Sequence, residues 1–231
     1  MTTTLITGGN KGLGFESARQ LAALGHTVYL GARDESRGRT AADELGVRFV
    51  QLDVTDQASV DAAIETITNE AGVLDVLINN AGILGRRSTP AEVEASDLEH
   101  VYATNVFGVV RLTHAALPLL EKSGNPIIVN VSSGLGALAE AADPTSFAAQ
   151  FPALTYGSSK SALLMITIQY ARALPAMRIN AIDPGYTATD FNGHEGTQTV
   201  EEGAEAIVTF ATIDQSGPTG TFQNKDGIVA W

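Results

Sequence analysis

The chain has 231 residues, a formal net charge of -12 at pH 7, and no cysteine. Hydrophobic residues make up 44% and charged residues 17%, which supplies an apolar core for one α/β domain and excludes a disordered chain. The negative charge argues against nucleic acid or an anionic membrane as the main partner, and the lack of cysteine excludes disulfides, thiolate metal sites and a cysteine nucleophile.

The first residues carry no basic segment followed by an apolar stretch, and no apolar run is long enough to span a membrane. We therefore expect a soluble, cytoplasmic protein, and the scattered histidines predict no metal site. Charge is unevenly spread. Residues 1–40 hold five basic and three acidic side chains, a net of +2, so the remainder carries -14. This distribution places an expected anion-binding site near the N-terminus.

Short apolar runs alternate with segments of helical period along the chain. Strands are predicted at residues 4–7, 27–31, 47–52, 73–78, 126–131 and 177–182. Helices are predicted at 12–24, 36–45, 56–71, 96–122, 155–174 and 200–211, with Gly25 following the first and a Ser96/Glu99 capping box before the fourth. The alternation predicts a Rossmann-like α/β fold with a doubly wound parallel sheet. Because no linker or repeat divides it, we expect a single domain over residues 1–231.

The first predicted strand runs directly into Thr7-Gly8-Gly9-Asn10-Lys11-Gly12-Leu13-Gly14, and a helix follows. Glycines at 8, 12 and 14 allow a tight turn, close approach of a ligand to the backbone, and close packing of the helix on the sheet. The N–H groups at the start of the helix would then face a pyrophosphate. This segment is therefore predicted to bind a dinucleotide.

The end of the second predicted strand indicates which dinucleotide binds. An NAD site needs an acidic residue there to hold the ribose diol, and Ala32 occupies that place. Arg33 follows, and a small residue before an arginine leaves room for a 2′-phosphate and gives it a charged partner. Lys11 and Arg37 could close on the same phosphate, so we predict NADP(H). Two alternatives remain: the arginines only solubilise a helix start, or Asp34 takes the acidic role one position late.

Polar residues follow the later predicted strands, at the edge where parallel strands end. They are Asn79-Asn80-Ala81-Gly82, Asn105 in the fourth predicted helix, Ser132-Ser133 after the fifth strand, and the pair Tyr156 and Lys160. Tyr156 and Lys160 are four residues apart and therefore share one face of a helix. Each of these residues alone is more often a cap, a turn or a surface group. Their order and their common edge indicate a catalytic site.

In these motifs the chain resembles the short-chain dehydrogenase/reductase family, in its single-domain form, over nearly its whole length. The matching motifs are T-G-x3-G-x-G at 7–14, Asp53-Val54, N-N-A-G at 79–82, Asn105-Val-Phe-Gly, Ser133, Y-x3-K at 156–160, and Pro184-Gly185 with Thr189. The turn T-G-G-N-K-G-L-G, the run G-A-R-D-x-S-R-G at 31–38 and the tail at 202–231 are similar to the carbonyl-reductase branch of that family.

The resemblance implies an NADPH-dependent oxidoreductase that reduces a ketone, aldehyde or quinone to an alcohol by hydride transfer. Tyr156 would be the general acid, and Lys160 would lower the pKa of Tyr156 toward working pH. Ser133 would hydrogen-bond the carbonyl oxygen of the substrate. Asn105 would orient the lysine through a water.

The resemblance also implies how the cofactor and substrate are held. Asp53 and Val54 would bracket the adenine. Asn80, Ala81 and Gly82 would line the ribose, which Tyr156 and Lys160 also approach. The implied cofactor contacts also include Pro184, Gly185, Thr187 and Thr189, and the two threonines would contact the carboxamide end. The implied substrate contacts are Ser133, Leu135 and Tyr186.

The sequence departs from the family in three places. Ser133 and Tyr156 are 23 residues apart, so residues 134–155 must form an extra loop, whose apolar side chains suggest a wall or lid of the substrate pocket. In the carbonyl-reductase branch a longer insertion here goes with a monomer, so a homo-oligomer (dimer or tetramer) and a monomer both stay open. The segment 190–199 is short, which suggests an open site. Tyr186 stands where the branch usually has tryptophan.

Three other functions compete with this interpretation. A serine hydrolase is disfavoured because the chain has neither a G-x-S-x-G nor an S-x-x-K motif. A 3-oxoacyl-thioester or polyketide-type ketoreductase is the alternative within the family. Outside the enzyme class, the alternative is a non-catalytic NADP(H)-sensing protein, although such proteins usually lose the Tyr/Lys pair.

Overall fold

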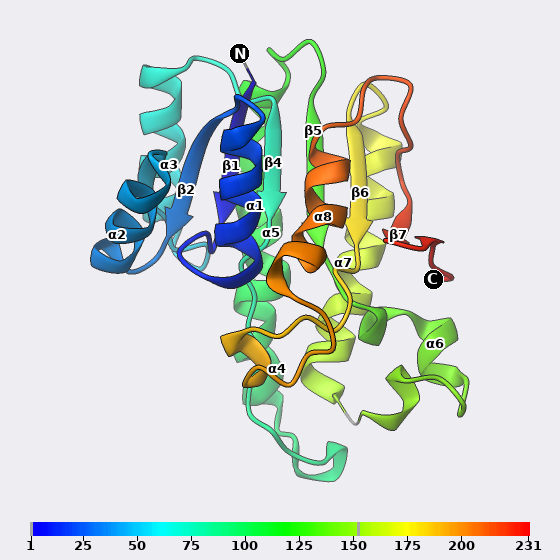
Figure 1. Ribbon diagram of the computed structural model, residues 1–231. Coiled ribbons are helices and arrows are strands. Elements are labelled where there is room, and N and C mark those ends of the chain that lie inside the picture. The colour runs from blue at the N-terminus through cyan, green and yellow to red at the C-terminus, as the bar shows by residue number, and fades with distance from the viewer. Residues whose placement is uncertain (1, 152) are drawn as a thin grey trace.

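The computed structural model describes residues 2–151 and 153–231, which fold into one sheet covered by helices on both faces (Figure 1). Within these residues the sheet has eight strands in the order β3-β2-β1-β4-β5-β6-β7-β8. All neighbouring strands are parallel except β7 and β8. The predicted doubly wound, Rossmann-like sheet is therefore confirmed.

The strands are β1 (Thr3–Thr7), β2 (Thr27–Ala32), β3 (Arg48–Gln51), β4 (Val76–Asn79), β5 (Ile127–Val131), β6 (Arg178–Ile182), β7 (Phe222–Asn224) and β8 (Gly227–Ile228). The helices are α1 (Gly12–Ala23), α2 (Glu35–Leu45), α3 (Gln57–Glu70), α4 (Ala95–Tyr102), α5 (Val109–Leu120), α6 (Leu138–Ala142), α7 (Leu154–Ala173) and α8 (Val200–Ala211). No helix within the described residues is long and apolar enough to cross a membrane.

Two apolar layers attach the helices to the sheet. One face packs on α1, α2 and α8, through side chains such as Leu21 and Ile207. The other packs on α3, α5 and α7, through side chains such as Ile67 and Leu112. Because strand side chains alternate between faces, β1, β4 and β5 contribute to both layers.

The common direction of the parallel strands distinguishes the edge of the sheet at their carboxyl ends from the edge at their amino ends. The parallel strands run in one direction, and their carboxyl ends meet at the lower edge in Figure 1. Strand order reverses between β1 and β4, which opens a crevice at that edge. The helix-to-strand connections lie at the opposite edge and turn at residues such as Gly25, which has a φ of 86° and follows α1 as predicted.

The prediction of one continuous helix at 96–122 is wrong. The segment forms two helices, α4 and α5, joined by a π-helical turn at Ala103–Gly108. Within that turn Gly108 packs on Val54, and a Cβ at Gly108 would lie 2.7 Å from the Val54 Cγ2 atom. Tertiary contact with the segment after β3 thus accompanies the wider turn, and π-turns of this kind are frequent at functional sites.

Two further expectations need correction, and two strands were missed. The capping box before α4 is Glu94 with Asp97 rather than Ser96 with Glu99, because the helix begins at Ala95. The fourth strand begins at Val76 and extends to Asn79, later than the predicted 73–78. Strands β7 and β8 were not predicted, since segments of three and two residues show no clear alternation.

Candidate active site

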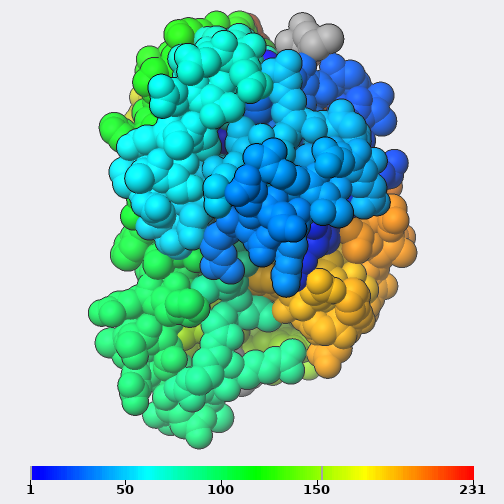
Figure 2. Space-filling model, turned by 90° about the vertical axis from the view of Figure 1, so that its left-hand side faces the viewer, coloured from blue at the N-terminus to red at the C-terminus, as the bar shows by residue number. Residues whose placement is uncertain are grey.

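A cavity of about 870 Å³ opens at the edge where the parallel strands end. Its walls come from the segments that follow β1, β2, β3, β4, β5 and β6, so it lies at the position expected for a ligand in a doubly wound sheet. In Figure 2 the teal-green segment after β4 and the yellow-orange segment after β6 stand on either side of a hollow beneath the blue N-terminal part. Most of the predicted site residues meet in this one cavity.

The Gly-rich turn forms one end of the cavity, as predicted, through Gly8, Asn10, Lys11, Gly12 and Leu13. Gly14 lies behind these residues. A Cβ there would come within 2.5 Å of the Gly8 carbonyl oxygen, so only glycine lets the helix start this close to the strand. No side chain caps α1, whose N-cap is Lys11. The first N–H groups of the helix are therefore available for an anionic ligand.

Basic side chains gather at the cavity around the end of β2. Ala32 is buried and small, and Arg33 and Arg37 line the cavity. Asp34 is occupied as the N-cap of α2, because its Oδ1 accepts the Arg37 backbone N–H at 2.9 Å. Lys11 also lines the cavity, but its Nζ pairs with Asp190 Oδ2 at 3.1 Å. The three basic residues thus share one cavity, with Lys11 held toward the segment after β6.

The segments after β3 and β4 continue the cavity wall beside the Gly-rich turn, where Asp53, Val54, Asn80, Ala81 and Gly82 all line it. Asn80 and Ala81 donate their backbone N–H groups to Thr7 Oγ1, each at 2.9 Å. The Asn80 side chain donates to the Thr7 carbonyl at 2.8 Å. Asn80 therefore ties the end of β4 to the Gly-rich turn across the crevice.

At the other end of the cavity, α7 presents Tyr156 and Lys160 beside Ser133. The Lys160 Nζ donates to the Val131 carbonyl at 2.7 Å and lies 5.5 Å from the centre of the Tyr156 ring. Ser133 follows β5 and is the N-cap of a short 3-10 turn, its Oγ accepting the Leu135 N–H at 3.2 Å. Three of the four predicted catalytic residues thus lie on one wall.

Asn105, the fourth, lies behind that wall and is only 1% exposed. Its Oδ1 accepts the Ile83 N–H at 2.9 Å, and its Nδ2 donates to the Ile83 carbonyl at 2.9 Å and to Ser159 Oγ at 3.0 Å. A Cβ at Gly82 would lie 3.4 Å from Asn105 Oδ1 and 3.8 Å from Lys160 Nζ. Asn105 therefore holds the segment after β4 against α7, and its hydrogen bonds do not reach the lysine directly.

Burial sets the protonation of the two α7 residues. It lowers the pKa of Lys160 to about 8, and the nearby Asp183 carboxylate opposes this change. Burial, followed by the Asp183 charge, raises the pKa of Tyr156, and the Ser133 hydroxyl opposes that rise. The Lys160 ammonium is directed at the Val131 carbonyl, and a lowering of the Tyr156 pKa by Lys160 stays a prediction.

The walls near Ser133 are apolar and aromatic. Leu135 and Tyr186 line the cavity, as does Phe191, whose ring centre is 5.8 Å from that of Tyr156. From the extra loop, Phe147 and Phe151 pack on the Tyr186 ring with centre distances of 5.5 and 6.5 Å. The loop contains α6 and a 3-10 turn at Ala148–Gln150, and residue 152 lies outside the described residues. Through these aromatic contacts the extra loop packs against Tyr186 in the cavity wall.

The segment after β6 closes the remaining side with Pro184, Gly185, Thr187 and Thr189. The Thr187 hydroxyl accepts from Gln198 Nε2 at 2.8 Å, and the same amide donates to the Pro184 carbonyl. A Cβ at Gly12 would lie 3.5 Å from Thr189 Cγ2. Thr189 is therefore packed against the Gly-rich turn.

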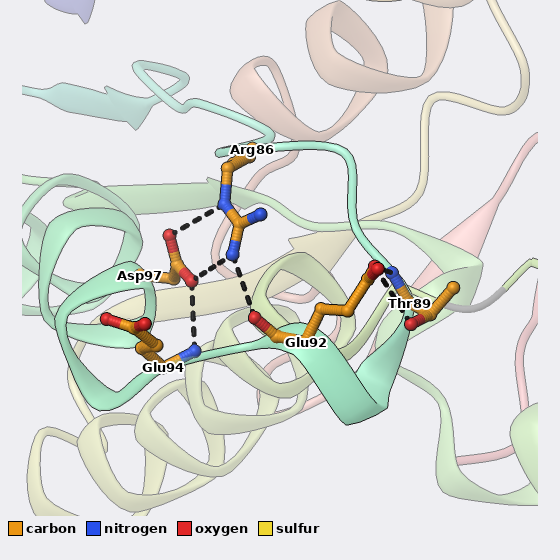
Figure 3. Close-up of polar contacts among 5 residues, drawn as sticks. All are labelled: Arg86, Thr89, Glu92, Glu94 and Asp97. Atoms are coloured by element: carbon orange, nitrogen blue, oxygen red, sulfur yellow. Dashed lines mark hydrogen bonds and ion pairs between the residues drawn. The ribbon is translucent and has the colours of Figure 1, made fainter.

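Sequence reasoning missed Arg86, which lines the cavity from the segment between β4 and α4. Its guanidinium binds both carboxylate oxygens of Asp97, with Nη2 2.9 Å from Oδ2, and donates to the Glu92 carbonyl at 2.8 Å (Figure 3). The pair and the Glu94 backbone N–H lower the pKa of Asp97 to about 2. These hydrogen bonds hold the segment between β4 and α4, which lines the cavity, against the start of α4. No motif marks them, since the partners are 11 residues apart.

The donor set fits a dinucleotide. Positive φ values at Gly8 and Gly12 form the turn, the uncapped start of α1 faces the cavity, and basic residues lie where the second strand ends. Ser132, which also lines the cavity, is 2% exposed, and its Oγ has no hydrogen-bond partner among the described residues. The residues described include no group of three His, Asp or Glu side chains placed to hold a metal ion.

Comparisons with known proteins agree with this geometry. The model of a family described as short chain dehydrogenase matches residues 2–199. The chain is 32% identical to carbonyl reductase [NADPH] 1 of Bos taurus, over 98% of this chain and 97% of that protein. It is 31% identical to a (+)-neomenthol dehydrogenase of Capsicum annuum, over 94% of each. A crystal structure of NADPH-bound carbonyl reductase from chicken fatty liver has a TM-score of 0.88 and 28% identity, covering 100% of this chain and 99% of that one.

Proposed function

This chain belongs to the short-chain dehydrogenase family, and from that premise we propose that it uses NADPH to reduce an apolar ketone, aldehyde or quinone to an alcohol. The observation that carries the proposal is that Ser133, Tyr156 and Lys160 share one cavity with the Gly-rich turn. A dinucleotide lying between the two ends would bring its nicotinamide to the catalytic wall.

NADPH, when bound, supplies the hydride. The Ser133 hydroxyl donates a hydrogen bond to the carbonyl oxygen of the substrate and stabilises the charge that develops there. Tyr156 transfers its phenolic proton to the same oxygen. Burial raises the pKa of Tyr156, which keeps the proton on the phenol at neutral pH but makes its release harder, so proton transfer needs a positive charge beside the tyrosine. Lys160, held by the Val131 carbonyl, stands beside the tyrosine and stabilises the phenolate that remains.

The choice of NADPH over NADH is supported by the side chains around the end of β2. Ala32 leaves space, Asp34 is used as a helix cap, and Arg33 faces the cavity. Asp34 also lines the cavity, but its carboxylate is engaged by the Arg37 backbone N–H and lies 3.8 Å from the Arg37 guanidinium, so the Arg33 guanidinium is left to bind a 2′-phosphate. Arg37 and Lys11 add positive charge to the same region.

The substrate is proposed to be apolar because Leu135, Tyr186 and Phe191 line the cavity, with the Leu135 N–H bonded to Ser133 and the Phe191 ring beside that of Tyr156. Purified protein should oxidise NADPH, and NADH more weakly, with members of a panel of quinones, aldehydes, ketones and 3-oxoacyl thioesters. Preference for thioesters would identify a ketoreductase of that type. Tight NADPH binding without turnover of any panel member would refute the proposal and favour a non-catalytic NADP(H)-sensing protein.

A further inference from the structure

Strand pairing continues for one residue beyond the ends of β5 and β6. The Ser132 N–H donates to the Ile182 carbonyl at 2.7 Å, and the Asp183 N–H donates to the Gln223 carbonyl at 2.8 Å. Val131 and Ile182 point into the layer beneath α1 and α8. Since side chains alternate along an extended strand, Asp183 points to the opposite face, the one covered by α7.

The Asp183 carboxylate is fixed in that direction. Its Oδ1 accepts the Gly185 N–H at 3.0 Å. Its Oδ2 lies against Gly134, where an added Cβ would be only 3.1 Å away. Glycine at 134 thus lets the carboxylate approach the backbone next to Ser133. Asp183 lines the same cavity as Ser133, Tyr156 and Lys160.

Lys160 needs an opposite charge in this position. It is 4% exposed, and its only hydrogen bond within the described residues is to the neutral Val131 carbonyl. An unpaired ammonium in such a place loses its hydration and tends to release its proton. Two charged side chains from packed elements face this region. Asp183 from the end of β6 acts on both Lys160 and Tyr156, and Glu140 from α6 acts on Asp183. Burial raises the pKa of Asp183 itself, and the backbone N–H groups of Gly185 and Gly134 together with the charge of Lys160 oppose that rise and favour the carboxylate.

We propose that Asp183 is a positioning residue of the active site, and that its carboxylate is the counter-ion that keeps the ammonium of Lys160 protonated. It acts through Lys160 and Tyr156 and contacts neither substrate nor the transferred hydride. Its negative charge favours the protonated form of both neighbours. In a carbonyl reductase these are the forms needed to deliver a proton, so Asp183 would sustain reduction at neutral and mildly alkaline pH.

The effect of Asp183 on carbonyl reduction rests on the proposed function, but its effect on the protonation of Lys160 does not. The chain has four lysines, at 11, 122, 160 and 225, so protein labelled with [ε-13C]lysine gives four titrating signals. Lys160→Arg identifies the signal of interest. In cofactor-free Asp183→Asn, we expect Lys160 to titrate about one pH unit lower than in wild type. This measurement needs no turnover, so it stays informative if the proposed substrate class is wrong.

Asp190→Asn is the matched control. It also removes one carboxylate from the cavity wall, but its partners are Lys11 and His194. It should leave the Lys160 signal in place. Asp183→Glu, which restores the charge, should return the Lys160 titration toward the wild-type pH. Asp183→Ala serves if the buried amide of the asparagine variant prevents folding.

A purely structural role for Asp183 predicts a different result. If the carboxylate only holds the turns at 134 and 185, its removal lowers kcat/KM equally at every pH. The counter-ion role predicts that the alkaline limb of the kcat/KM profile moves to lower pH in Asp183→Asn. A Lys160 titration unchanged in both neutral variants would overturn the proposal.

Discussion

Replacing Gly136 by alanine tests whether the contact between the turn after β5 and helix α7 sets the position of Lys160. Gly136 lies in the 3-10 turn at Gly134–Gly136, and it is not part of the cavity wall. An added Cβ would lie 2.6 Å from the Lys160 Cβ and 2.8 Å from the Ser161 backbone nitrogen. The helix backbone is not a flexible side-chain end, so either the turn or α7 must move.

The size of the movement follows from the contact distance. Ordinary van der Waals contact begins at 3.4 Å, so the two elements would have to separate by about 0.8 Å. Overpacking of this kind costs about 1–3 kcal/mol of unfolding free energy, or roughly 2–12 °C in Tm for a chain of this length. A misplacement of about 1 Å at a catalytic group lowers the rate by roughly 10²-fold. We therefore expect kcat/KM to fall about 100-fold.

The assay is turnover with the best carbonyl substrate, together with NADPH affinity and thermal unfolding. NADPH affinity should change little, because the pyrophosphate end of the site is untouched. Gly124→Ala is the matched control: this glycine is exposed, and a Cβ there meets no atom within 4 Å. It should keep full activity and gain about 0.4–1 kcal/mol of stability. Equal behaviour of the two alanine variants would refute the assigned contact.

Three further substitutions test the remaining assignments. Arg33→Asp should weaken NADPH binding by roughly 10–100-fold, because a charged hydrogen bond contributes about 1.5–3 kcal/mol. It should change NADH binding little. An equal effect on the binding of both cofactors would contradict the 2′-phosphate site. Tyr156→Phe should lower kcat by about 10²–10⁴-fold with NADPH affinity unchanged, and retained turnover would exclude Tyr156 as the acid. Asp97→Asn should raise KM more than it lowers kcat, with only a small fall in Tm, because the pair with Arg86 is partly exposed but orders a cavity wall. An unaltered KM would show that the wall does not depend on this pair.

The sequence was sufficient for those parts of the site that depend on local geometry. The Gly-rich turn is set by backbone requirements at Gly8, Gly12 and Gly14, which one strand-to-helix junction reveals. The positions of Tyr156 and Lys160 follow from helical spacing on α7, and that of Ser133 from the end of a parallel strand. The fold class follows from the alternation of strands and helices.

The remaining features depend on contacts between distant segments. The π-helical turn at Ala103–Gly108 has the apolar pattern of an ordinary helix, and its contact with Val54 becomes visible only in three dimensions. Asp183 sits beside the Pro184-Gly185 motif, but its proximity to Lys160 depends on how β6 and α7 pack. The pairing of Arg86 with Asp97 depends on the path of a loop. Periodicity carries no information about such pairs.

The separation of the two sheet edges also has a use in biocatalysis. The turns at Gly25, Gly46 and Gly124 lie between a helix and the next strand, on the side of the sheet away from the cavity, and an added Cβ at each meets no atom within 4 Å. Chemical attachment to a solid support, or insertion of a carrier peptide, can therefore be directed to these turns. An immobilised enzyme anchored there would present its cavity to the medium, with the segments that line it free to exchange substrate and product.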